Sequence, residues 1–519
     1  MWIKPISPYY GYYDPEFVYL LNSLEVFKGH LYVYVDHPGT PIEMIGTLIY
    51  ASTYPFLHRS LPSFVTWHVE NPGLFLNLAH GFLLALNIVC VVWFFKVATV
   101  TRRGADVILG CALALLYFVI HPLSFFALNV WSHNSFSFPV GTPLLLLLYG
   151  SVNSASQHPE MPWKKLIALG LAMGIFASIT IYLASWILGA AITIAVSYQL
   201  QRISPRKTIL ALGVFAVSGV AGFFLAITPV LGGFQNFVEW IASLLTHQNL
   251  YQVVAPQLPI YRRLLISLTL MWQQLPALTV AMILLSILSL LALLIWHKRM
   301  SEKPGLWALL LGLLLQIFVL MAFFLDRFVQ FYMLSIAAII PVLAMNITRL
   351  YEHYSGIHRY LKVAFTLAVS AGLLWSIQAA MAMRQGYVAD VTTIEDQTTQ
   401  AIKQYAASSG EAPDQVKLVW SYGMFSPCNS LSFGNNYTGG AFNSEISKIC
   451  RNQHEFNPWI GKILAGDRRI NLEDKDWDLF FSYEELLPPR TLSDPQLSIT
   501  RMAIPDMGFG DLVIVRRNK

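Results

Sequence analysis

The stretch GLWALLLGLLLQIFVLMAFFL, residues 305–325, contains no charged side chain and is long enough to cross a membrane as a single helix. A membrane-crossing helix needs roughly 20 apolar residues, because only a helix satisfies every backbone donor and acceptor inside hydrocarbon. The rest of the chain shares this character, since 55% of its 519 residues are hydrophobic, 12% are charged, and the mean hydropathy is +0.53. Soluble domains carry about 25% charged residues. The sequence therefore predicts a polytopic α-helical membrane protein.

Similar apolar stretches predict about ten transmembrane helices between residues 73 and 383. The run from Leu166 to Tyr198 has no charge, but at about 1.5 Å per residue it would be ~50 Å long, more than the roughly 30 Å hydrocarbon core. We therefore expect two short helices there, with a break between Ser178 and Trp186. The other predicted spans are Gly73 to Phe95, Val107 to Ile120, Ser135 to Tyr149, Ile209 to Val230, Leu275 to Trp296, Gly305 to Leu325, Phe328 to Met345 and Leu361 to Met383.

The basic residues predict the orientation, because Lys and Arg in short loops stay on the cytoplasmic side. With ten spans, all the basic clusters fall on one face of the membrane. These clusters are Lys96, Arg102 and Arg103; Lys164 and Lys165; Arg202, Arg206 and Lys207; Lys298, Arg299 and Lys303; and Arg349, Arg359 and Lys362. They also account for the net charge of +5, so nothing in the composition indicates a nucleic-acid partner. We expect residues 1–72, the loop Gly232 to Arg263 and residues 384–519 to lie on the outer face of the membrane.

Three regions follow from this orientation. Residues 1–72 form an outer-face segment in which Ile42 to Leu57 lies as a helix at the membrane interface, since counting it as a span would invert the charge pattern of every later loop. Either a first span precedes Met1 or the later helices hold this segment outside. Residues 73–383 form the membrane region. Residues 384–519 have the composition of a small α/β domain outside the membrane.

The outer α/β domain has its own sequence signals. Compact apolar runs predict strands at Val416 to Trp420, Trp477 to Phe481 and Leu512 to Val515. Cys428 and Cys450 both lie in this domain, and a disulfide between them is compatible with an oxidising compartment.

Acidic residues near the N-terminus are the first candidates for chemistry. In Asp14-Pro15-Glu16, Asp14 is placed to act as a general base toward a hydroxyl, and Glu16 can share its pocket. The alternative is that these residues only open a helix from Phe17 to Leu24, with proline in the first turn and acid at the positive helix end.

A second motif, Asp36-His37-Pro38-Gly39-Thr40-Pro41, follows about twenty residues later. Two prolines restrict its backbone, and Asp36 and His37 can position a hydroxyl, a phosphate or a divalent ion. A plain turn before the interfacial helix is the alternative interpretation. Walker, Rossmann and zinc-type cysteine motifs are absent from the sequence, so it has no signal for a soluble nucleotide.

The order of these features resembles the GT-C polyprenyl-phosphate-sugar glycosyltransferases, which include the protein O-mannosyltransferase and lipid A aminoarabinose transferase branches. The resemblance covers the acidic motif, the His-Pro motif, the interfacial helix, the series of transmembrane spans and the final outer domain. Asp326-Arg327-Phe328, followed by Tyr332 and Pro341, is similar to the family's late Arg/Tyr segment.

The chain departs from the family's pattern at three places, which suggests a divergent branch. The span that usually precedes the acidic motif is not in this sequence. The family's second motif is more often Lys or His followed by two prolines, where this chain has His37-Pro38-Gly39-Thr40-Pro41. The next outer loop reads Trp131-Ser132-His133-Asn134 instead of carrying the usual charged residue.

The resemblance implies a GT-C-like fold and a reaction at the outer face of a bacterial inner membrane, in contact with membrane lipids. A sugar would move from a polyprenyl-phosphate donor, whose tail lies between the spans, to a hydroxyl of a lipid, polysaccharide or protein acceptor. Asp14 would deprotonate that hydroxyl, and Arg327 would stabilise the departing phosphate. Further candidates for substrate binding are Glu16, Asp36, His37, His133, Arg262 and Arg263.

Several of these residues have a structural role as the alternative to substrate binding. Arg327 can pair with Asp326, and Arg262 and Arg263 can anchor the span that follows them. A divalent cation is a further alternative, because Asp36 and His37 would need a third ligand to hold one. No metal ligand is assigned.

Other classes of function fit parts of the pattern. A secondary transporter would have a similar number of spans but would place charged groups near the bilayer midplane. A surface-polysaccharide polymerase or ligase would differ mainly in its acceptor. A non-catalytic assembly scaffold would need neither Asp14 nor a phosphate-binding cation.

Overall fold

The computed structural model divides the chain into two compact units, which we call the sheet unit and the bundle unit. The sheet unit comprises residues 1–34, 43–79 and 382–519, and the bundle unit comprises residues 35–42 and 80–381. The residues that the structure describes are 13–32, 40–57, 59–99, 110, 130–154, 162–179, 183–231, 258–274, 276–323, 329–354, 378, 382, 385, 389, 392–421, 426–458, 461–465, 468–474, 476–488, 491, 494–502 and 511–517.

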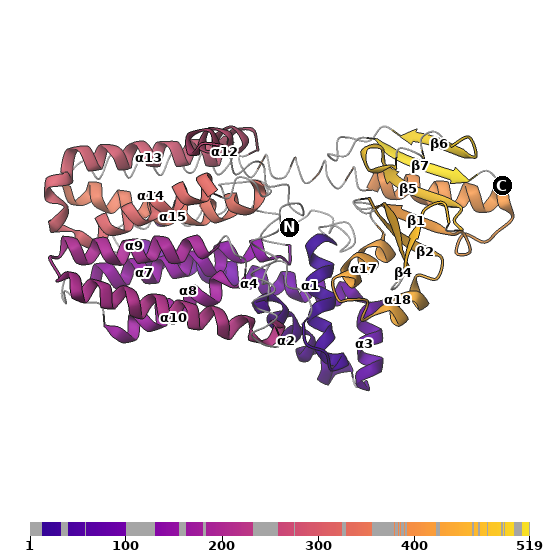
Figure 1. Ribbon diagram of the computed structural model, residues 1–519, viewed down its shortest axis with the longest axis horizontal. Coiled ribbons are helices and arrows are strands. Elements are labelled where there is room, and N and C mark those ends of the chain that lie inside the picture. Colours follow the sequence, from indigo (N-terminus) through magenta and orange to yellow (C-terminus); the bar gives the residue numbers. More distant parts are fainter. Residues whose placement is uncertain are drawn as a thin grey trace. The chain divides into compact units, whose positions relative to one another are not determined.

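The bundle unit consists of long apolar helices that lie along a common direction (Figure 1). Helix α4 begins in the sheet unit and continues into the bundle unit. The helices are α4 (Pro72–Ala98), η3 (His133–Phe136), η4 (Ser137–Gly141), α7 (Thr142–Ser154), α8 (Trp163–Ala177), α9 (Ala184–Leu200), α10 (Pro205–Leu231), α12 (Ile260–Gln274), α13 (Pro276–Trp296), η6 (His297–Glu302), α14 (Pro304–Phe323) and α15 (Val329–Tyr354).

Six helical segments among the described residues are long and apolar enough to cross a membrane. They are Pro72–Ala98, His133–Asn153, Pro205–Pro229, Leu278–Glu302, Pro304–Phe323 and Met333–Tyr354, and each overlaps a predicted span. The predicted break in the uncharged run is confirmed, because α8 ends at Ala177 and α9 begins at Ala184. The predicted spans Val107 to Ile120 and Leu361 to Met383 lie almost wholly outside the described residues.

Small residues and buried hydroxyl groups join the helices of the bundle. At Gly170 of α8, an added Cβ would lie 2.6 Å from the carbonyl oxygen of Phe215 on α10. Trp186 of α9 donates to the hydroxyl of Ser335 on α15 at 2.6 Å. Close backbone contact at glycine, reinforced by hydrogen bonds between helices, is how helices associate where lipid removes the hydrophobic driving force.

Large apolar side chains cover the outside of the bundle unit. Leu294 on α13 is 73% exposed, and Val217 on α10 is 71% exposed. Contiguous apolar surface of this kind is unfavourable in water and is expected on a lipid-facing helix. The bundle therefore has the architecture of a membrane region.

The sheet unit contains a seven-stranded mixed sheet in the order β4-β3-β2-β1-β5-β7-β6 (Figure 1). The central strand β1 pairs in parallel with both β2 and β5, and the outer pairs are antiparallel. The strands are β1 (Leu418–Ser421), β2 (Gln453–Asn457), β3 (Lys462–Ala465), β4 (Arg468–Asn471), β5 (Leu479–Tyr483), β6 (Leu497–Met502) and β7 (Leu512–Arg517). The helices between them are α17 (Pro427–Asn436), α18 (Asn443–Ile449) and η7 (Glu484–Leu486), and residues 392–409 precede the sheet as a further helix.

The sheet is covered on both faces, so its central strands are apolar throughout. Leu418 and Phe481 belong to the core on one face, which also includes Tyr405 from helix 392–409. Val419 and Phe480 belong to the core on the other face. Continuous apolar runs are typical of strands buried on both faces. The predicted strands and the α/β class of this domain are confirmed.

The N-terminal helices belong to the same unit as the sheet. They are α1 (Tyr13–Glu25), η2 (Val26–Lys28), α2 (Thr40–Leu57) and α3 (Leu61–Glu70). The ring of Tyr50 on α2 stacks on Phe75 with centroids 4.3 Å apart and meets His68 of α3 at 4.7 Å. The helix predicted over Ile42 to Leu57 is thus present as α2, and its position at a membrane interface stays a prediction.

Candidate active site

Asp14 lies in the first turn of α1. Pro15 follows it, and proline suits this position because its fixed φ is helical and the first-turn N–H groups have no partner within the helix. An acid here also interacts favourably with the positive end of the helix dipole. Both interpretations of Asp14-Pro15-Glu16 therefore agree on the backbone: the motif opens a helix, and that helix carries the candidate base.

Helix α1 is buried from Glu16 to its C-terminal end. Every residue from Glu16 to Glu25 is buried, including Glu16 itself at 2% exposure. The buried amide of Asn22 donates to the carbonyl of Val18 at 2.8 Å, and the hydroxyl of Ser23 donates to that of Tyr19 at 2.6 Å. The helix thus satisfies these polar groups internally, and its surroundings restrict its movement.

Helix α17 packs closely on α1. A Cβ added to Gly434 would fall well inside van der Waals contact with the carbonyl oxygen of Phe17, so only glycine allows the two backbones to approach in this way. Phe17 is three residues after Asp14 in the chain. The position of the candidate base along the molecule therefore depends on a helix more than 400 residues later in the sequence.

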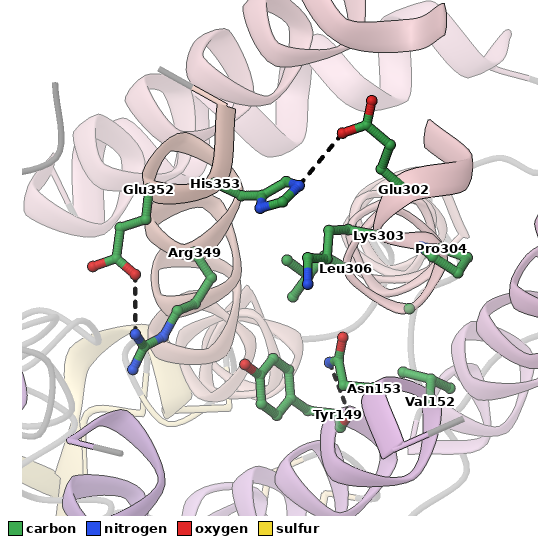
Figure 2. A pocket seen from close by; sticks show the side chains of 11 residues that line it. Tyr149, Val152, Asn153, Glu302, Lys303, Pro304, Leu306, Arg349, Glu352 and His353 are labelled. Carbon is green, nitrogen blue, oxygen red and sulfur yellow. Dashed lines mark hydrogen bonds and ion pairs between the residues drawn. The ribbon is translucent and has the colours of Figure 1, made fainter. Parts of the chain in front are cut away.

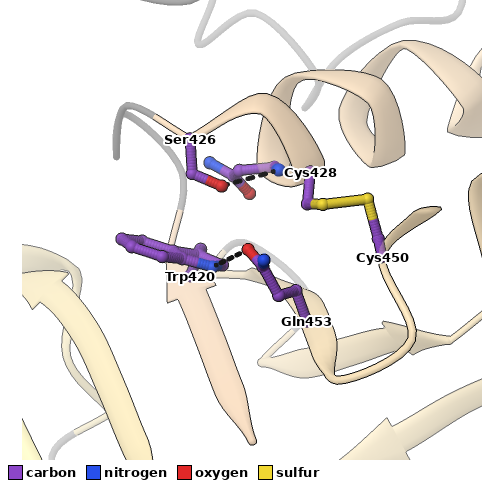
Figure 3. The surroundings of a disulfide bond; sticks show 6 residues. Trp420, Ser426, Cys428, Cys450 and Gln453 are labelled. Atoms are coloured by element: carbon purple, nitrogen blue, oxygen red, sulfur yellow. Dashed lines mark hydrogen bonds between the residues drawn. A yellow bond between two sulfur atoms is a disulfide. The ribbon is translucent and has the colours of Figure 1, made fainter. Parts of the chain in front are cut away.

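Two local features fix α17 (Figure 3). Ser426 caps its N-terminus by accepting a hydrogen bond from the backbone N–H of Asn429 at 3.2 Å. The disulfide that the sequence left open is present, since Cys428 in the first turn is bonded to Cys450 at the end of α18, with the two Cα atoms 5.6 Å apart. The cap and the cross-link hold the helix that supports α1.

Lys28 makes a second link between the N-terminal segment and the C-terminal domain. Its ammonium group donates to the carbonyl of Ala441 at 2.6 Å and pairs with Glu445 at 2.9 Å, and it lies 4.9 Å from the ring centre of Phe442. Burial alone would raise the pKa of Glu445, but hydrogen bonds from Lys28 and Ser444 outweigh it, and the pKa is lowered. Glu445 is therefore ionised at neutral pH, as the ion pair requires.

A pocket of about 470 Å³ opens in the sheet unit beside the C-terminal end of α1. Glu25 and His30 line one side of it, and residues 438–441, 443 and 444 line the other. Asn435 organises the second wall: its side chain donates to that of Asn443 at 2.7 Å and accepts from the backbone of Phe442 at 2.9 Å. A carboxylate, an imidazole, hydroxyl groups and peptide groups thus surround one polar space.

Glu43 lies on α2, close enough for the charge of Glu25 to affect its ionisation. It is completely buried, and neither of its carboxyl oxygens has a hydrogen-bond partner among the described residues. Burial, and secondly the charge of Glu25, raise the pKa of Glu43 well above its usual range. An unpaired buried carboxylate is costly, so the neutral acid is the favoured form.

The predicted site residues are divided between the two units. Asp14 and Glu16 lie on α1 in the sheet unit. His133, which begins η3 and is 2% exposed, belongs to the bundle unit, as do Arg262 and Arg263 in the first turn of α12. Arg262 is exposed, and Arg263 donates from Nε to the carbonyl of Leu258 at 3.0 Å. Asp36, His37 and Arg327 lie outside the described residues.

Glu25 and Glu43 are not among the site residues predicted from the sequence. Their sequence context could have indicated them, because each is an acid inside an otherwise apolar helical segment. These segments are Leu24-Glu25-Val26 and Ile42-Glu43-Met44. Within the part of the chain that the structure describes, no three His, Cys, Asp or Glu side chains are grouped to hold a metal ion. The alternative of a cation at Asp36 and His37 concerns residues beyond that part.

Comparison of the chain with models of protein families finds no match, and comparison with curated proteins finds none either.

Proposed function

We propose that this protein is a glycosyltransferase of the GT-C type that moves a sugar from a polyprenyl-phosphate donor to an acceptor hydroxyl at the outer face of a membrane. The observation that carries the proposal is the placement of Asp14 at the start of a buried helix, beside a disulfide-linked domain that contains a polar pocket. A disulfide suits an oxidising compartment outside the cytoplasm.

In the proposed reaction, the carboxylate of Asp14 takes the proton of the acceptor hydroxyl as its oxygen attacks the anomeric carbon of the sugar. The bond from that carbon to the phosphate oxygen breaks, and the polyprenyl phosphate leaves with the bonding electrons. Cationic side chains would stabilise the leaving phosphate, with Arg327 as first candidate and Arg262 and Arg263 after it. Glu16, Asp36, His37 and His133 would bind the substrates.

The distribution of charge in the described spans favours this proposal over a transporter. Every Asp, Glu, Lys and Arg within the six spans lies near a helix end, in the terminal two turns: Lys96, Arg206, Lys207, Lys298, Arg299, Glu302, Arg349 and Glu352. Transporters place ionisable groups near the bilayer midplane, where substrate and coupling ions bind. The charge distribution of the described spans is therefore compatible with a reaction at the membrane surface and not at the bilayer midplane.

The test is sugar transfer in membranes that contain wild-type protein, Asp14→Asn or a control variant. Each membrane sample receives radiolabelled polyprenyl-phosphate sugars, and the protein level is measured on the same sample. Removing a general base typically costs 10²–10⁴-fold in rate, so we expect Asp14→Asn to lose at least about 100-fold. The control is Asp414→Asn, the same change at an exposed acid of the sheet unit, which should keep full activity.

The three outcomes differ in meaning. Loss of transfer in Asp14→Asn alone supports the proposal and identifies the donor. Equal transfer in all three proteins removes Asp14 from the mechanism while leaving the enzyme class. Absence of transfer by wild-type protein from every donor contradicts the glycosyltransferase proposal.

A further inference from the structure

A second pocket lies in the bundle unit, at the ends of the helices that carry the basic residues. It has a volume of about 380 Å³ and is formed by the C-terminal ends of α7 and α15 and by the start of α14 (Figure 2). Tyr149 and Asn153 come from α7, Lys303 immediately precedes α14, and Arg349 comes from α15. Three segments distant in sequence thus place donor groups around one opening.

Most of the charged groups at this pocket already have partners. Arg349 pairs with Glu352 at 3.0 Å and donates to the carbonyl of Ala98 at 2.7 Å. Glu302 accepts from Arg299 at 2.7 Å and 2.9 Å and lies 3.5 Å from His353. These two groups of residues balance their own charges.

Lys303 differs from its neighbours. Within the described ranges, its ammonium group has neither an ion-pair partner nor a hydrogen-bond acceptor, although two glutamates line the same pocket. Among the described residues, the charge of Lys303 is therefore the one positive charge at this pocket that no side chain compensates. The hydroxyl of Tyr149, which makes no hydrogen bond to another described residue, and the side-chain amide of Asn153 add hydrogen-bonding groups close by (Figure 2).

Aromatic residues surround the same end of the bundle. Trp296 at the end of α13 stacks on Tyr354 at the end of α15 with centroids 5.3 Å apart. Trp307, in the first turn of α14, donates to the hydroxyl of Tyr354 at 3.1 Å. Trp and Tyr are enriched at the depth of lipid headgroups, so these residues indicate that the pocket opens at that depth.

We propose that this pocket binds the phosphate of an anionic phospholipid headgroup. Lys303 supplies the charge, Arg349 supplies further N–H groups, and Tyr149 and Asn153 donate hydrogen bonds to the phosphate oxygens. Charge-assisted hydrogen bonds to phosphate are among the strongest that side chains make. The site is separate from the acidic segment of the sheet unit, and its occupation does not depend on sugar transfer.

The experiment measures thermal unfolding of the full-length protein in a neutral detergent while one ligand is titrated. The ligands are phosphatidylglycerol, phosphatidylcholine and inorganic phosphate, each added alone. The variant is Lys303→Gln, which removes the uncompensated charge from an exposed position and should fold normally. The matched control is Lys298→Gln, which removes an exposed charge from η6 without touching the pocket.

We expect phosphatidylglycerol to raise the unfolding temperature of wild-type protein and of Lys298→Gln at the same concentrations. Lys303→Gln should need about tenfold more lipid, because one charge-assisted contact contributes roughly that factor to affinity. Phosphatidylcholine should stabilise less, since its choline group cancels the headgroup's negative charge.

The inorganic phosphate titration separates the two sources of the ligand. Stabilisation by inorganic phosphate that Lys303→Gln removes would assign the site to a free anion and overturn the lipid proposal. Equal responses of Lys303→Gln and Lys298→Gln to phosphatidylglycerol would overturn it too, as would absence of any response in wild-type protein.

Discussion

The two units of this protein are stabilised by different means, and the difference follows from their solvents. The sheet unit buries large aromatic side chains such as Trp477, Phe480 and Phe481 on the two faces of its sheet, and a disulfide cross-links it. The bundle unit instead joins helices at small residues and leaves large apolar side chains on its outside. Burial of apolar surface stabilises only what would otherwise face water. The same residue types therefore form the core of one unit and the surface of the other.

The largest change in stability that we expect comes from removing the disulfide of the sheet unit. Replacing both Cys428 and Cys450 with Ser should destabilise the sheet unit by about 3 kcal/mol, because the bridge closes a loop over a sequence separation of 22 residues and restricts the unfolded chain. Limited proteolysis and denaturant unfolding, followed by the fluorescence of the sheet unit's tryptophans, measure the change.

The control for the disulfide is the free cysteine of the other unit. Cys90 is buried in α4, and its thiol lies 3.6 Å from the carbonyl of Phe138. Cys90→Ala should leave the proteolysis of the sheet unit unchanged. Equal resistance of the double Ser variant and wild-type protein would show that the noncovalent core alone determines the stability of the sheet unit.

Helix packing in the bundle gives the next prediction. Gly174 of α8 faces the backbone of α10 at Gly219, and a Cβ there would overlap the carbonyl group of Gly219. Gly174→Ala must separate the two helices, and overpacking of this kind costs about 1–3 kcal/mol. The thermal unfolding temperature of the purified protein in detergent measures it.

A matched substitution on α10 should act in the opposite direction. A Cβ at Gly213 would meet nothing within 4 Å. Gly213→Ala therefore adds no clash and should stabilise the helix by roughly 0.5–1 kcal/mol, since glycine is less favourable than alanine in a helix interior. If both variants shift the unfolding temperature in the same direction, close backbone contact is not what holds α8 and α10 together.

Local composition predicted several elements of both units, because the pattern of each of these elements is contained within it. The break between α8 and α9 followed from the length of an uncharged run, and β1, β5 and β7 followed from compact apolar runs. The disulfide was one of two open alternatives and is present.

The surroundings of the candidate site could not be predicted in this way. The hydrogen bond from Lys28 to Ala441 joins residues 413 positions apart in the sequence. The packing of α17 on α1 joins segments with a similar sequence separation. Neither has a local pattern that indicates its partner. The roles of Glu25 and Glu43 emerge only when α1 and α2 lie together, because a single acid in an apolar segment does not reveal what surrounds it.

The next prediction concerns Glu43, a buried acid of the sheet unit, and tests whether its burial changes the stability of that unit with pH. Its pKa is raised in the folded protein, so the folded state binds this proton more tightly than the unfolded state does. The stability contributed by the proton is complete at pH values below the unfolded pKa and is lost as the pH rises toward the folded pKa. Glu43→Gln cannot lose a proton, so this variant should be more stable than wild-type protein at pH 7 and lose that advantage at pH 4. Unfolding midpoints between pH 4 and pH 8 measure the difference.

Glu485 provides the comparison for Glu43, because it is an exposed acid of the same unit. Glu485→Gln should follow the wild-type pH profile throughout. A Glu43→Gln profile parallel to that of wild-type protein would mean that Glu43 ionises as readily in the folded chain as in the unfolded one.

The last comparison concerns two ion pairs within the sheet unit. Lys28 and Glu445 are 23% and 11% exposed, whereas the side chains of Lys417 and Asp476, which also pair, are 46% and 72% exposed. Because solvent screens exposed pairs, Lys28→Met should cost about 1 kcal/mol and Lys417→Met should cost nothing measurable. The lowered pKa of Glu445 also predicts how the effect of Lys28→Met depends on pH. The stability that the Lys28 pair contributes is present above the usual carboxyl pKa and is lost as the pH falls through the lowered value.

The unfolding midpoints of the two variants should therefore differ at pH 7 and converge in acid. A difference that persists in acid would mean that Lys28 acts through its contacts with Ala441 and Phe442 and not through its charge.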